Sequence, residues 1–422
     1  MIDFELVGNP CGIPVYFQRL PGNRVSIRLA FFVGSMDDAE AGGDGAAHWF
    51  EHVPFNGTVG YPNGDDQICG PIIRHAGSLN AHTSHCRTVY HSVVPKRIWQ
   101  QALDIVTDLG GRPSLTDEGI ELERRVIYNE IATARSDIGK RVWQNVLPSL
   151  WPGHPLGHAV LGTETSLSFM NPETIRTAHR RLYDRSRAVL VISGDIDPDL
   201  VLLVAEQQLE KIPDHGLSER HGSISYGELP LWQPRREEWP VGFEPSLIAM
   251  AWPINRAVES SVFKQDWLQN WLRSIFTVGS LCSPLLRILR RERQLVYSAS
   301  ASNFFPSLDG GTFFLTALTK SKENVPAVIQ GFQDAITSEQ IRSTDWYDYL
   351  VDNIKGSRDM EVPEAHDHTS ILLSRLLAHG LAPLGDNEWY KGLLEVSHAQ
   401  VLAALDELTP KRACTLILKG TK

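Results

Sequence analysis

The sequence predicts an α+β protein made of two similar units, each a sheet packed against helices, with a linker between them. The chain has 422 residues, enough for two to four domains. Strand and helix patterns recur in the same order before and after residues 213–240, which indicates a duplicated α/β unit. In that interval, His, Gly and Pro residues interrupt every regular pattern. We therefore expect domains at residues 1–212 and 241–422, with residues 213–240 as the linker.

The first half opens with two short predicted strands at residues 15–17 and 25–31, separated by a Pro-Gly-Asn turn. An acidic, glycine-rich loop then leads into a short helix that contains His48 and His52, with Asp44 as its expected N-cap. We expect this helix to end near Phe55, before Asn56-Gly57, and Pro54 is a residue that can end it earlier. The patterns that follow indicate a helix at 65–75 interrupted at 70–71, strands at 77–81 and 87–94, helices at 95–109, 116–135 and 175–183, and a buried strand at 187–193.

The second half repeats this alternation. Strands are expected at residues 246–252, 297–305, 311–319 and 413–419. Helices are expected at residues 260–276, 285–292, 325–336, 346–360 and 369–377.

The amino-acid composition and the net charge indicate the class of protein and exclude some kinds of partner. Apolar residues make up 42% and charged residues 21% of the chain, which is typical of globular proteins. The formal net charge of −10 argues against a nucleic-acid partner. The five cysteines are far apart and form no Cys-x-x-Cys pair, as expected for free thiols in a reducing compartment. No leader peptide or bilayer-length apolar run is visible, so we expect a soluble cytoplasmic protein with no membrane partner.

The stretch Ala47-His48-Trp49-Phe50-Glu51-His52-Val53 carries the most specific chemistry in the chain. In a helix, His48, Glu51 and His52 share one face because they are three and four residues apart. Two imidazoles on one face can hold a zinc ion, which in catalytic sites takes a third protein ligand and a water. Glu51 is then placed to take a proton from that water. The order His-x-x-Glu-His is that of the inverzincin motif.

The helix expected at residues 116–135 offers carboxylates for the missing ligand. Glu123 and Glu130 are seven residues apart and share a face. The apolar residues Leu122, Val126, Tyr128 and Ile131 suggest that part of the helix is buried. A carboxylate against a core needs a partner. From the residues alone, that partner is either a metal or one of the nearby arginines Arg124, Arg125 and Arg135.

Residues 45–58 resemble the signature of the pitrilysin-type zinc metallopeptidases, and further landmarks follow in order. The strand Gly77-Ser78-Leu79-Asn80-Ala81 resembles the family's Gly-x-x-Asn-Ala strand, and Glu123 with Glu130 resembles its pair of helical glutamates. The resemblance implies that Glu130 is the third ligand of one Zn²⁺ per chain and that Glu123 is a supporting carboxylate. It also implies that the strand carrying Asn80 and Ala81 binds the peptide substrate.

Arg290 and Tyr297 in the second half, seven residues apart, resemble a family pair that reaches the substrate carbonyl. The alternative, on the residues alone, is a surface salt-bridge arginine and a core tyrosine. The second half contains no His-x-x-Glu-His sequence, in keeping with the family pattern.

The resemblance implies a zinc-dependent endopeptidase that cleaves peptides or short unfolded polypeptides inside a closed chamber, with Glu51 as general base on zinc-bound water. The chain resembles the short bacterial, processing-peptidase-like members, so it is expected to form half of a clamshell with a second copy or a related subunit. Two alternatives stay open: a dedicated leader- or presequence-processing subunit of a heteromeric complex, and a non-catalytic structural member. The second usually lacks the His and Glu residues that are present here.

Overall fold

The computed structural model describes residues 4–136, 146–216, 235–241, 245–255, 262–278, 283–307, 310–360, 365–379 and 385–420. The chain divides into two compact units. Unit 1 consists of Met1–Asp137, Gly153–Ile224 and Pro363–Asp386; unit 2 consists of Ile138–Pro152, Ser225–Val362 and Asn387–Lys422. The expected mixture of helices and sheets in two units is confirmed. The domain boundaries expected at residues 212 and 241 stay a prediction.

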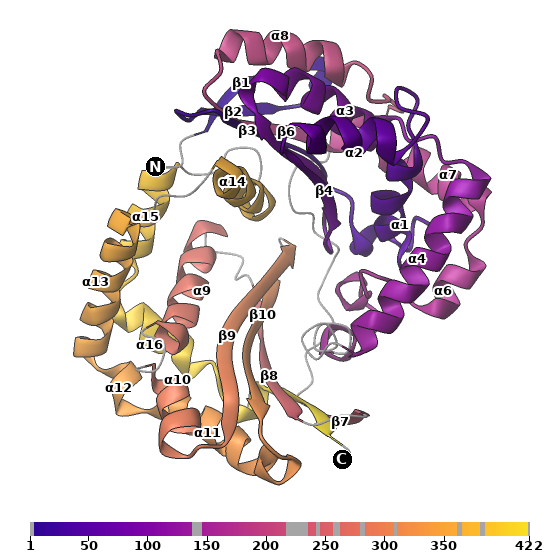
Figure 1. Ribbon diagram of the computed structural model, residues 1–422. Coiled ribbons are helices and arrows are strands. Elements are labelled where there is room, and N and C mark those ends of the chain that lie inside the picture. The colour runs from indigo at the N-terminus through magenta and orange to yellow at the C-terminus, as the bar shows by residue number, and fades with distance from the viewer. Residues whose placement is uncertain are drawn as a thin grey trace. The chain divides into compact units, whose positions relative to one another are not determined.

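Unit 1 is built on a six-stranded sheet in the order β1-β2-β6-β3-β5-β4 (Figure 1). β6 is buried along its whole length and pairs parallel with β2 and antiparallel with β3. β4 is the last strand of the sheet and pairs with β5. The strands are β1 Glu5–Gly8, β2 Val15–Arg19, β3 Arg24–Phe31, β4 Ser78–Thr83, β5 Thr88–Pro95 and β6 Ala188–Gly194.

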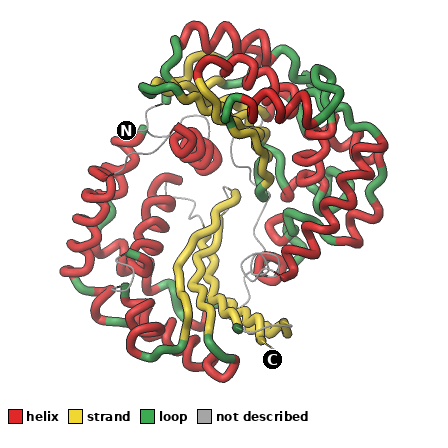
Figure 2. Tube along the Cα trace, in the orientation of Figure 1, coloured by secondary structure: helices red, strands yellow, loops and turns green. Residues whose placement is uncertain are grey.

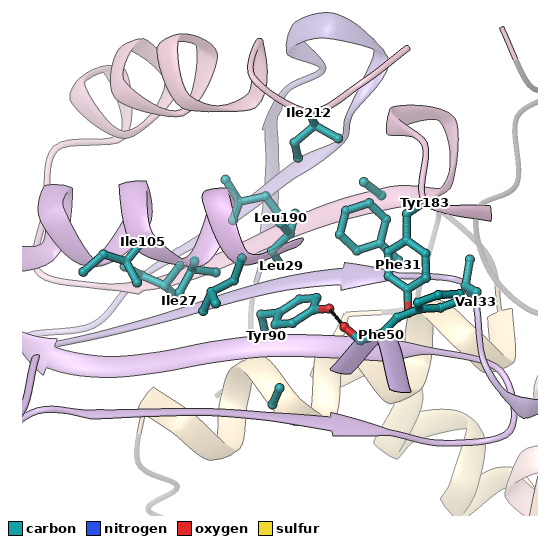
Figure 3. Packing of buried hydrophobic residues seen from close by; sticks show 14 of the residues in the cluster. Ile27, Leu29, Phe31, Val33, Phe50, Tyr90, Ile105, Tyr183, Leu190 and Ile212 are labelled. Atoms are coloured by element: carbon teal, nitrogen blue, oxygen red, sulfur yellow. Dashed lines mark hydrogen bonds between the residues drawn. The ribbon is translucent and has the colours of Figure 1, made fainter. Parts of the chain in front are cut away.

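One face of this sheet forms the main core of unit 1. Ile27, Leu29 and Phe31 alternate along β3 toward this face and are fully buried, together with Tyr90 of β5 and Ile105 of α3 (Figure 3). The α-helices described in the first two segments of the unit are α1 Ala46–His52, α2 Asp65–Arg74, α3 Trp99–Gly111, α4 Asp117–Ser136, α6 Glu164–Phe169, α7 Pro172–Leu182 and α8 Pro198–Leu209.

The interruption expected at residues 70–71 is wrong, because α2 is one helix that contains Pro71. Ile68 and Ile72 are fully buried on either side of the proline. Their burial offsets the hydrogen bond that a proline removes from a helix interior.

The opposite face of the first sheet is covered by a helix from late in the chain, α14 (Ala365–His379). Leu372, Leu373 and Leu376 of α14 pack in one apolar cluster with residues of the sheet. Thr369 accepts a hydrogen bond from Arg28 Nε of β3 at 2.8 Å. The sequence indicates a helix at residues 369–377 but gives no sign that it belongs with the first sheet.

Unit 2 contains a five-stranded sheet in the order β7-β11-β8-β10-β9 (Figures 1 and 2). β7 and β11 are parallel and the other neighbours are antiparallel. Strands β2-β6-β3-β5-β4 of unit 1 have the same order and the same directions, which supports duplication of one unit. The strands are β7 Arg235–Val241, β8 Ser246–Asn255, β9 Val296–Ser307, β10 Gly310–Thr319 and β11 Cys414–Gly420.

β7 occupies residues that the sequence assigned to the linker. Pro240 suggested irregular backbone there, but β7 is the end strand of its sheet, where a residue without an N–H donor is tolerated. Residues 217–234 of the expected linker lie outside the described residues.

Helices of unit 2 pack on its sheet around Trp271, Phe276 and Phe332. In the part of the chain that the structure describes, no helix combines the length and apolar character needed to cross a bilayer. The helices are α9 Val262–Thr277, α10 Pro284–Leu286 with the π-helical turn Arg287–Glu292, α11 Val325–Thr337, α12 Glu339–Arg342, α13 Thr344–Met360, α15 Asp386–Glu395 and α16 His398–Asp406.

The buried His179 of α7 makes the stability of unit 1 depend on pH. Its ring stacks on Tyr183 with centroids 4.8 Å apart and meets Phe50 edge-on at 5.6 Å. Burial lowers the pKa of His179 to about 3. An unfolded histidine titrates near about 6.5, so between these two values the unfolded chain binds a proton that the folded chain does not.

We expect this contribution to stability to be complete above about pH 6.5 and to be lost progressively as the pH falls toward 3, by up to about tenfold in the folding equilibrium per pH unit. His179→Phe, which keeps an aromatic ring, should flatten the profile. Urea unfolding of both proteins from about pH 4 to 7 measures the difference. Parallel profiles would show that His179 does not cause the dependence.

Candidate metal centre

The candidate centre begins with α1, a seven-residue helix too short to be stable on its own. Its N-cap is Gly45 with a φ of 96°, not the expected Asp44, because the left-handed conformation at this position favours glycine. The fully buried carboxylate of Asp38 accepts hydrogen bonds from the N–H groups of Gly45 at 2.7 Å and Ala47 at 2.9 Å. Burial raises the pKa of Asp38 well above its usual value, although these two donors oppose the shift.

The other side of α1 is fixed by the core. Trp49 and Phe50 are fully buried, and Tyr90 Oη of β5 donates a hydrogen bond to the Phe50 carbonyl at 2.6 Å (Figure 3). With these residues facing the core, the remaining face of the helix carries His48, Glu51 and His52. The α-helix ends at His52, three residues before the end expected near Phe55, and a 3-10 turn containing Pro54 continues over Val53–Asn56.

The carboxylates come from α4. The buried positions of this helix include Ile120, Glu123 and Ile127, which follow helical spacing. Of the apolar residues that indicated a buried side, Ile131 is 3% exposed and Tyr128 is partly buried, which confirms that part of the helix is buried. Leu122 and Val126 are each 43% exposed, because apolar residues occur on both sides of this helix.

His48, His52 and Glu130 converge on one point. The two imidazole Nε2 atoms are 3.3 Å apart. Glu130 Oε2 lies 3.6 Å from His48 Nε2 and 3.6 Å from His52 Nε2. Within the described part of the chain, these three residues form a group whose ligand atoms are close enough together to hold one metal ion.

The separation of the three atoms fits a zinc ion. Tetrahedral zinc with metal–ligand bonds of about 2.0–2.1 Å would hold its ligand atoms roughly 3.3–3.4 Å apart. Two imidazoles and one carboxylate are also a known catalytic zinc set that leaves a fourth position open. The donor chemistry and the spacing therefore agree with zinc, with small adjustments of Glu130.

A second layer orients His52. Glu123 Oε2 lies 3.0 Å from His52 Nδ1, and Asn56 Nδ2 donates to Glu123 Oε1 at 2.7 Å. A carboxylate at Nδ1 favours the tautomer with the proton on that nitrogen, so the lone pair of Nε2 faces the cluster. Burial opposes the charged form of His52, but Glu123, Glu51 and Glu130 together raise its pKa.

Burial likewise opposes the charged form of Glu123, but hydrogen bonds from His52 and Asn56 outweigh it and lower the Glu123 pKa. Asn56, Asp38 and Tyr90 were not identified from the sequence. Of these three residues, only Asn56 has a position from which the sequence could have identified it, because it lies four residues after His52 at the end of the helical stretch.

Glu51 lies beside the cluster of His48, His52 and Glu130 but is not one of its three ligand residues. Its Oε2 lies 3.9 Å from His48 Nε2, and its side chain is 14% exposed. Burial raises the pKa of Glu51, which favours a carboxyl group able to hold a proton for part of a reaction.

Asn80 and Ala81 lie on β4, at the end of the first sheet. Asn80 is exposed, while Ala81 is buried and opposite Tyr90 in the β4–β5 register. The Asn80 side-chain oxygen accepts a hydrogen bond from the Ala81 N–H at 2.9 Å. Among the described strands, β5 alone pairs with β4, so its other edge is open to an extended peptide.

Arg290 and Tyr297 belong to unit 2. Arg290 is exposed on the π-helical turn, a feature often found at functional sites. Tyr297 is 54% exposed near the start of β9, so the alternative of a core tyrosine is wrong. Their approach to a substrate stays a prediction.

The two halves of the chain match two domains of one known protein family. Residues 15–164 match the family described as insulinase (peptidase family M16), and residues 170–347 match the peptidase M16 inactive domain. An uncharacterised zinc protease of Mycobacterium leprae is 29% identical over 346 residues, which cover 79% of this chain and 73% of that protein.

Two solved structures share the fold. A protease from Helicobacter pylori has a TM-score of 0.83 and 17% identity, with 99% of both chains covered. Pitrilysin has a TM-score of 0.76 and 19% identity, with 97% of this chain but only 44% of pitrilysin covered. A chain of this length therefore matches somewhat less than half of pitrilysin.

Removal of the Glu130 charge should weaken metal binding. Glu130→Gln is expected to reduce zinc affinity by more than the roughly 10–100-fold typical of second-layer changes, because a direct ligand is lost. Competition with a zinc chelator, read by metal analysis, measures it. Glu118→Gln, an exposed position on the same helix, is the matched control. Normal zinc occupancy in Glu130→Gln would point to a different third ligand.

Glu123→Gln should act less severely, since it changes the residue that orients His52. We expect zinc affinity to fall about 10–100-fold while one ion per chain still binds at saturation. The same chelator competition tests this. An affinity equal to that of Glu118→Gln would contradict the orienting role.

Proposed function

This chain belongs to the M16 family of peptidases, and we propose that it is a zinc-dependent endopeptidase that hydrolyses short peptides or unfolded polypeptides. The observation that carries the proposal is the convergence of His48, His52 and Glu130 within 3.3–3.6 Å, with the Glu51 carboxylate 3.9 Å from His48. The ligand set and an adjacent base together are what metal-assisted peptide hydrolysis requires.

Zinc, when bound, polarises the peptide carbonyl and makes water a better nucleophile at neutral pH. Glu51 accepts a proton from the attacking water as the new carbon–oxygen bond forms. It then gives that proton to the amine nitrogen as the carbon–nitrogen bond breaks, so that the products are an amine and a carboxylic acid, which loses its proton to solvent at neutral pH. The raised pKa of Glu51 supports this double role, because the group must hold the proton between the two steps.

Two further parts of unit 1 serve the same reaction. Glu123 keeps the lone pair of His52 Nε2 directed at the cluster through its contact with Nδ1. The open edge of β4 pairs with the substrate backbone, a contact that depends little on the peptide sequence. The Asn80 side-chain oxygen accepts a hydrogen bond from the Ala81 N–H. When the peptide pairs with the edge of β4, the Asn80 side chain moves away or shares that N–H donor with the peptide.

We propose that Arg290 and Tyr297 of one chain donate hydrogen bonds to the carbonyl oxygen of the reacting bond at the metal centre of a partner chain. We propose that the chain pairs with a second copy or a related subunit, so that two chains enclose the substrate. The match to 44% of pitrilysin supports this, because the unmatched part of that chain is long enough for a second segment of this size. The side chains of Arg290 and Tyr297 are exposed, as expected for residues that contact a substrate.

A dedicated precursor-processing role would use the same residues and differ only in substrate. A non-catalytic role is disfavoured by the presence of Glu51, which a purely structural metal site does not need.

Glu51→Gln separates binding from chemistry. We expect zinc content equal to that of the wild type and a loss of cleavage of an internally quenched peptide of about 10²–10⁴-fold, the usual contribution of a general base. Glu118→Gln should match the wild type in both measurements. Full cleavage by Glu51→Gln would sink the role given to this residue, and loss of zinc would make it a ligand instead.

A further inference from the structure

β4, the last strand of the first sheet, presents its side chains to two different surroundings (Figure 1). Ala81 points to the core face, where it lies opposite Tyr90, and Tyr90 holds α1 on that same side. Successive side chains of a strand alternate between faces, so His82 points to the other face. It is partly exposed there. His82 therefore lies on the proposed substrate strand but on the opposite face from the helix that carries Glu51.

A second imidazole lies beside His82. The ring centroid of His91 in β5 is 5.7 Å from that of His82, and the ring planes are inclined by 58°. His91 is opposite Asn80 in the register, so it is a diagonal neighbour of His82 on one face. The residues of β4 and β5 on this face include no acidic side chain. They are Ser78, Asn80, His82, Val89, His91 and Val93.

The backbone of β4 determines how a paired peptide meets His82. Ser84, one residue past the end of β4, donates its N–H to the Arg87 carbonyl across the hairpin at 2.8 Å. Main-chain groups alternate sides along an antiparallel strand, so those of His82 also face β5, while those of Ala81 face the open edge. The hydrogen bond from the Ala81 N–H to the Asn80 side chain agrees with this.

A peptide that pairs antiparallel with the open edge would place one residue opposite His82 in a pair without main-chain hydrogen bonds. Such pairs have Cα atoms only about 4.5 Å apart and bring their side chains closest together, on one face. Thr83, the next residue of β4, is near enough to the Glu51 carboxylate to oppose the rise in its pKa. The peptide residue opposite His82 is therefore close to the bond that is cleaved.

The chemistry of this face favours an acidic side chain. An imidazole carries an N–H donor in its neutral and in its charged form. A carboxylate accepts such a hydrogen bond about twice as strongly as an uncharged amide does. A lysine or arginine side chain would find no carboxylate among the residues of β4 and β5 on this face.

We propose that His82, with the ring of His91 against it, forms a subsite for a peptide residue that carries a carboxylate, so that the substrates are peptides with Asp or Glu close to the cleaved bond. The inference rests on the proposed function, because it takes the peptide to pair with β4.

Internally quenched peptides test this preference on the wild-type chain. Glu is placed at successive positions around the cleaved bond of one uncharged parent peptide, and each peptide is compared with its Gln counterpart, with the cleaved bond identified by mass spectrometry. At one position, kcat/KM should be about threefold to tenfold higher for Glu than for Gln. The two neighbouring positions should give no such gain, because their side chains point to the other face. Absence of a gain at every position would overturn the proposal.

His82→Phe keeps a ring but removes the donor, so it should lower the ratio of the Glu to the Gln peptide to about one. His82→Gln keeps a neutral N–H donor and should retain part of the preference. The matched control is His215→Phe, at an exposed histidine of unit 1 outside β4 and β5, which should keep the wild-type ratio. Circular dichroism checks that each variant folds. An unchanged ratio in folded His82→Phe would contradict the assignment.

Binding distinguishes this proposal from the peptidase proposal. If the wild-type chain cleaves none of the peptides, the proposed function fails, and the subsite is then tested by fluorescence anisotropy of labelled Glu and Gln peptides with the zinc-loaded Glu51→Gln chain. Tighter binding of the Glu peptide, lost when His82→Phe is added, would support the subsite without any cleavage. Equal affinity for the two peptides would overturn it.

Discussion

The two hydrogen bonds that the Asp38 carboxylate accepts from the N–H groups of Gly45 and Ala47, at the start of α1, are the constraint on which the metal centre depends. A seven-residue helix does not persist in water by itself, so its position has to be imposed by the surrounding fold. Asp38 holds its start, and Tyr90 holds the Phe50 carbonyl from the sheet side. Both contacts are buried, where a hydrogen bond is strong and its loss is costly. The imidazoles are thus fixed by residues that never contact the metal.

The two units share one strand order and use it differently. In unit 1 the segment between β3 and β4 carries α1 and the histidines, whereas in unit 2 the segment between β8 and β9 carries α9 and the π-helical turn. Strand order is set by sheet pairing and core packing, which constrain the connecting segments little. Because the connecting segments can differ, one unit contains the candidate metal ligands and the other contains an apolar pocket with Gln269 in its wall.

The compact units also do not follow the order of the chain. α14 supplies Leu372, Leu373 and Leu376 to the face of the first sheet opposite the main core. A fragment ending at residue 212 would leave that face of β3 and β6 uncovered, with the Arg28 guanidinium deprived of its Thr369 partner. The metal centre therefore belongs to a unit that needs residues from beyond residue 360 to be complete.

The sequence alone determined the alternation of strands and helices, the shared face of His48, Glu51 and His52, and the helical spacing of Glu123 and Glu130, because these follow from local periodicity. Tertiary structure decided which carboxylate reaches the imidazoles, since contacts across 70 or more residues depend on packing. It also decided that Asp38 and not Asp44 holds α1, that residues 235–241 form a strand, and that α14 completes the first unit. These contacts join distant segments, and local patterns carry no signal for them.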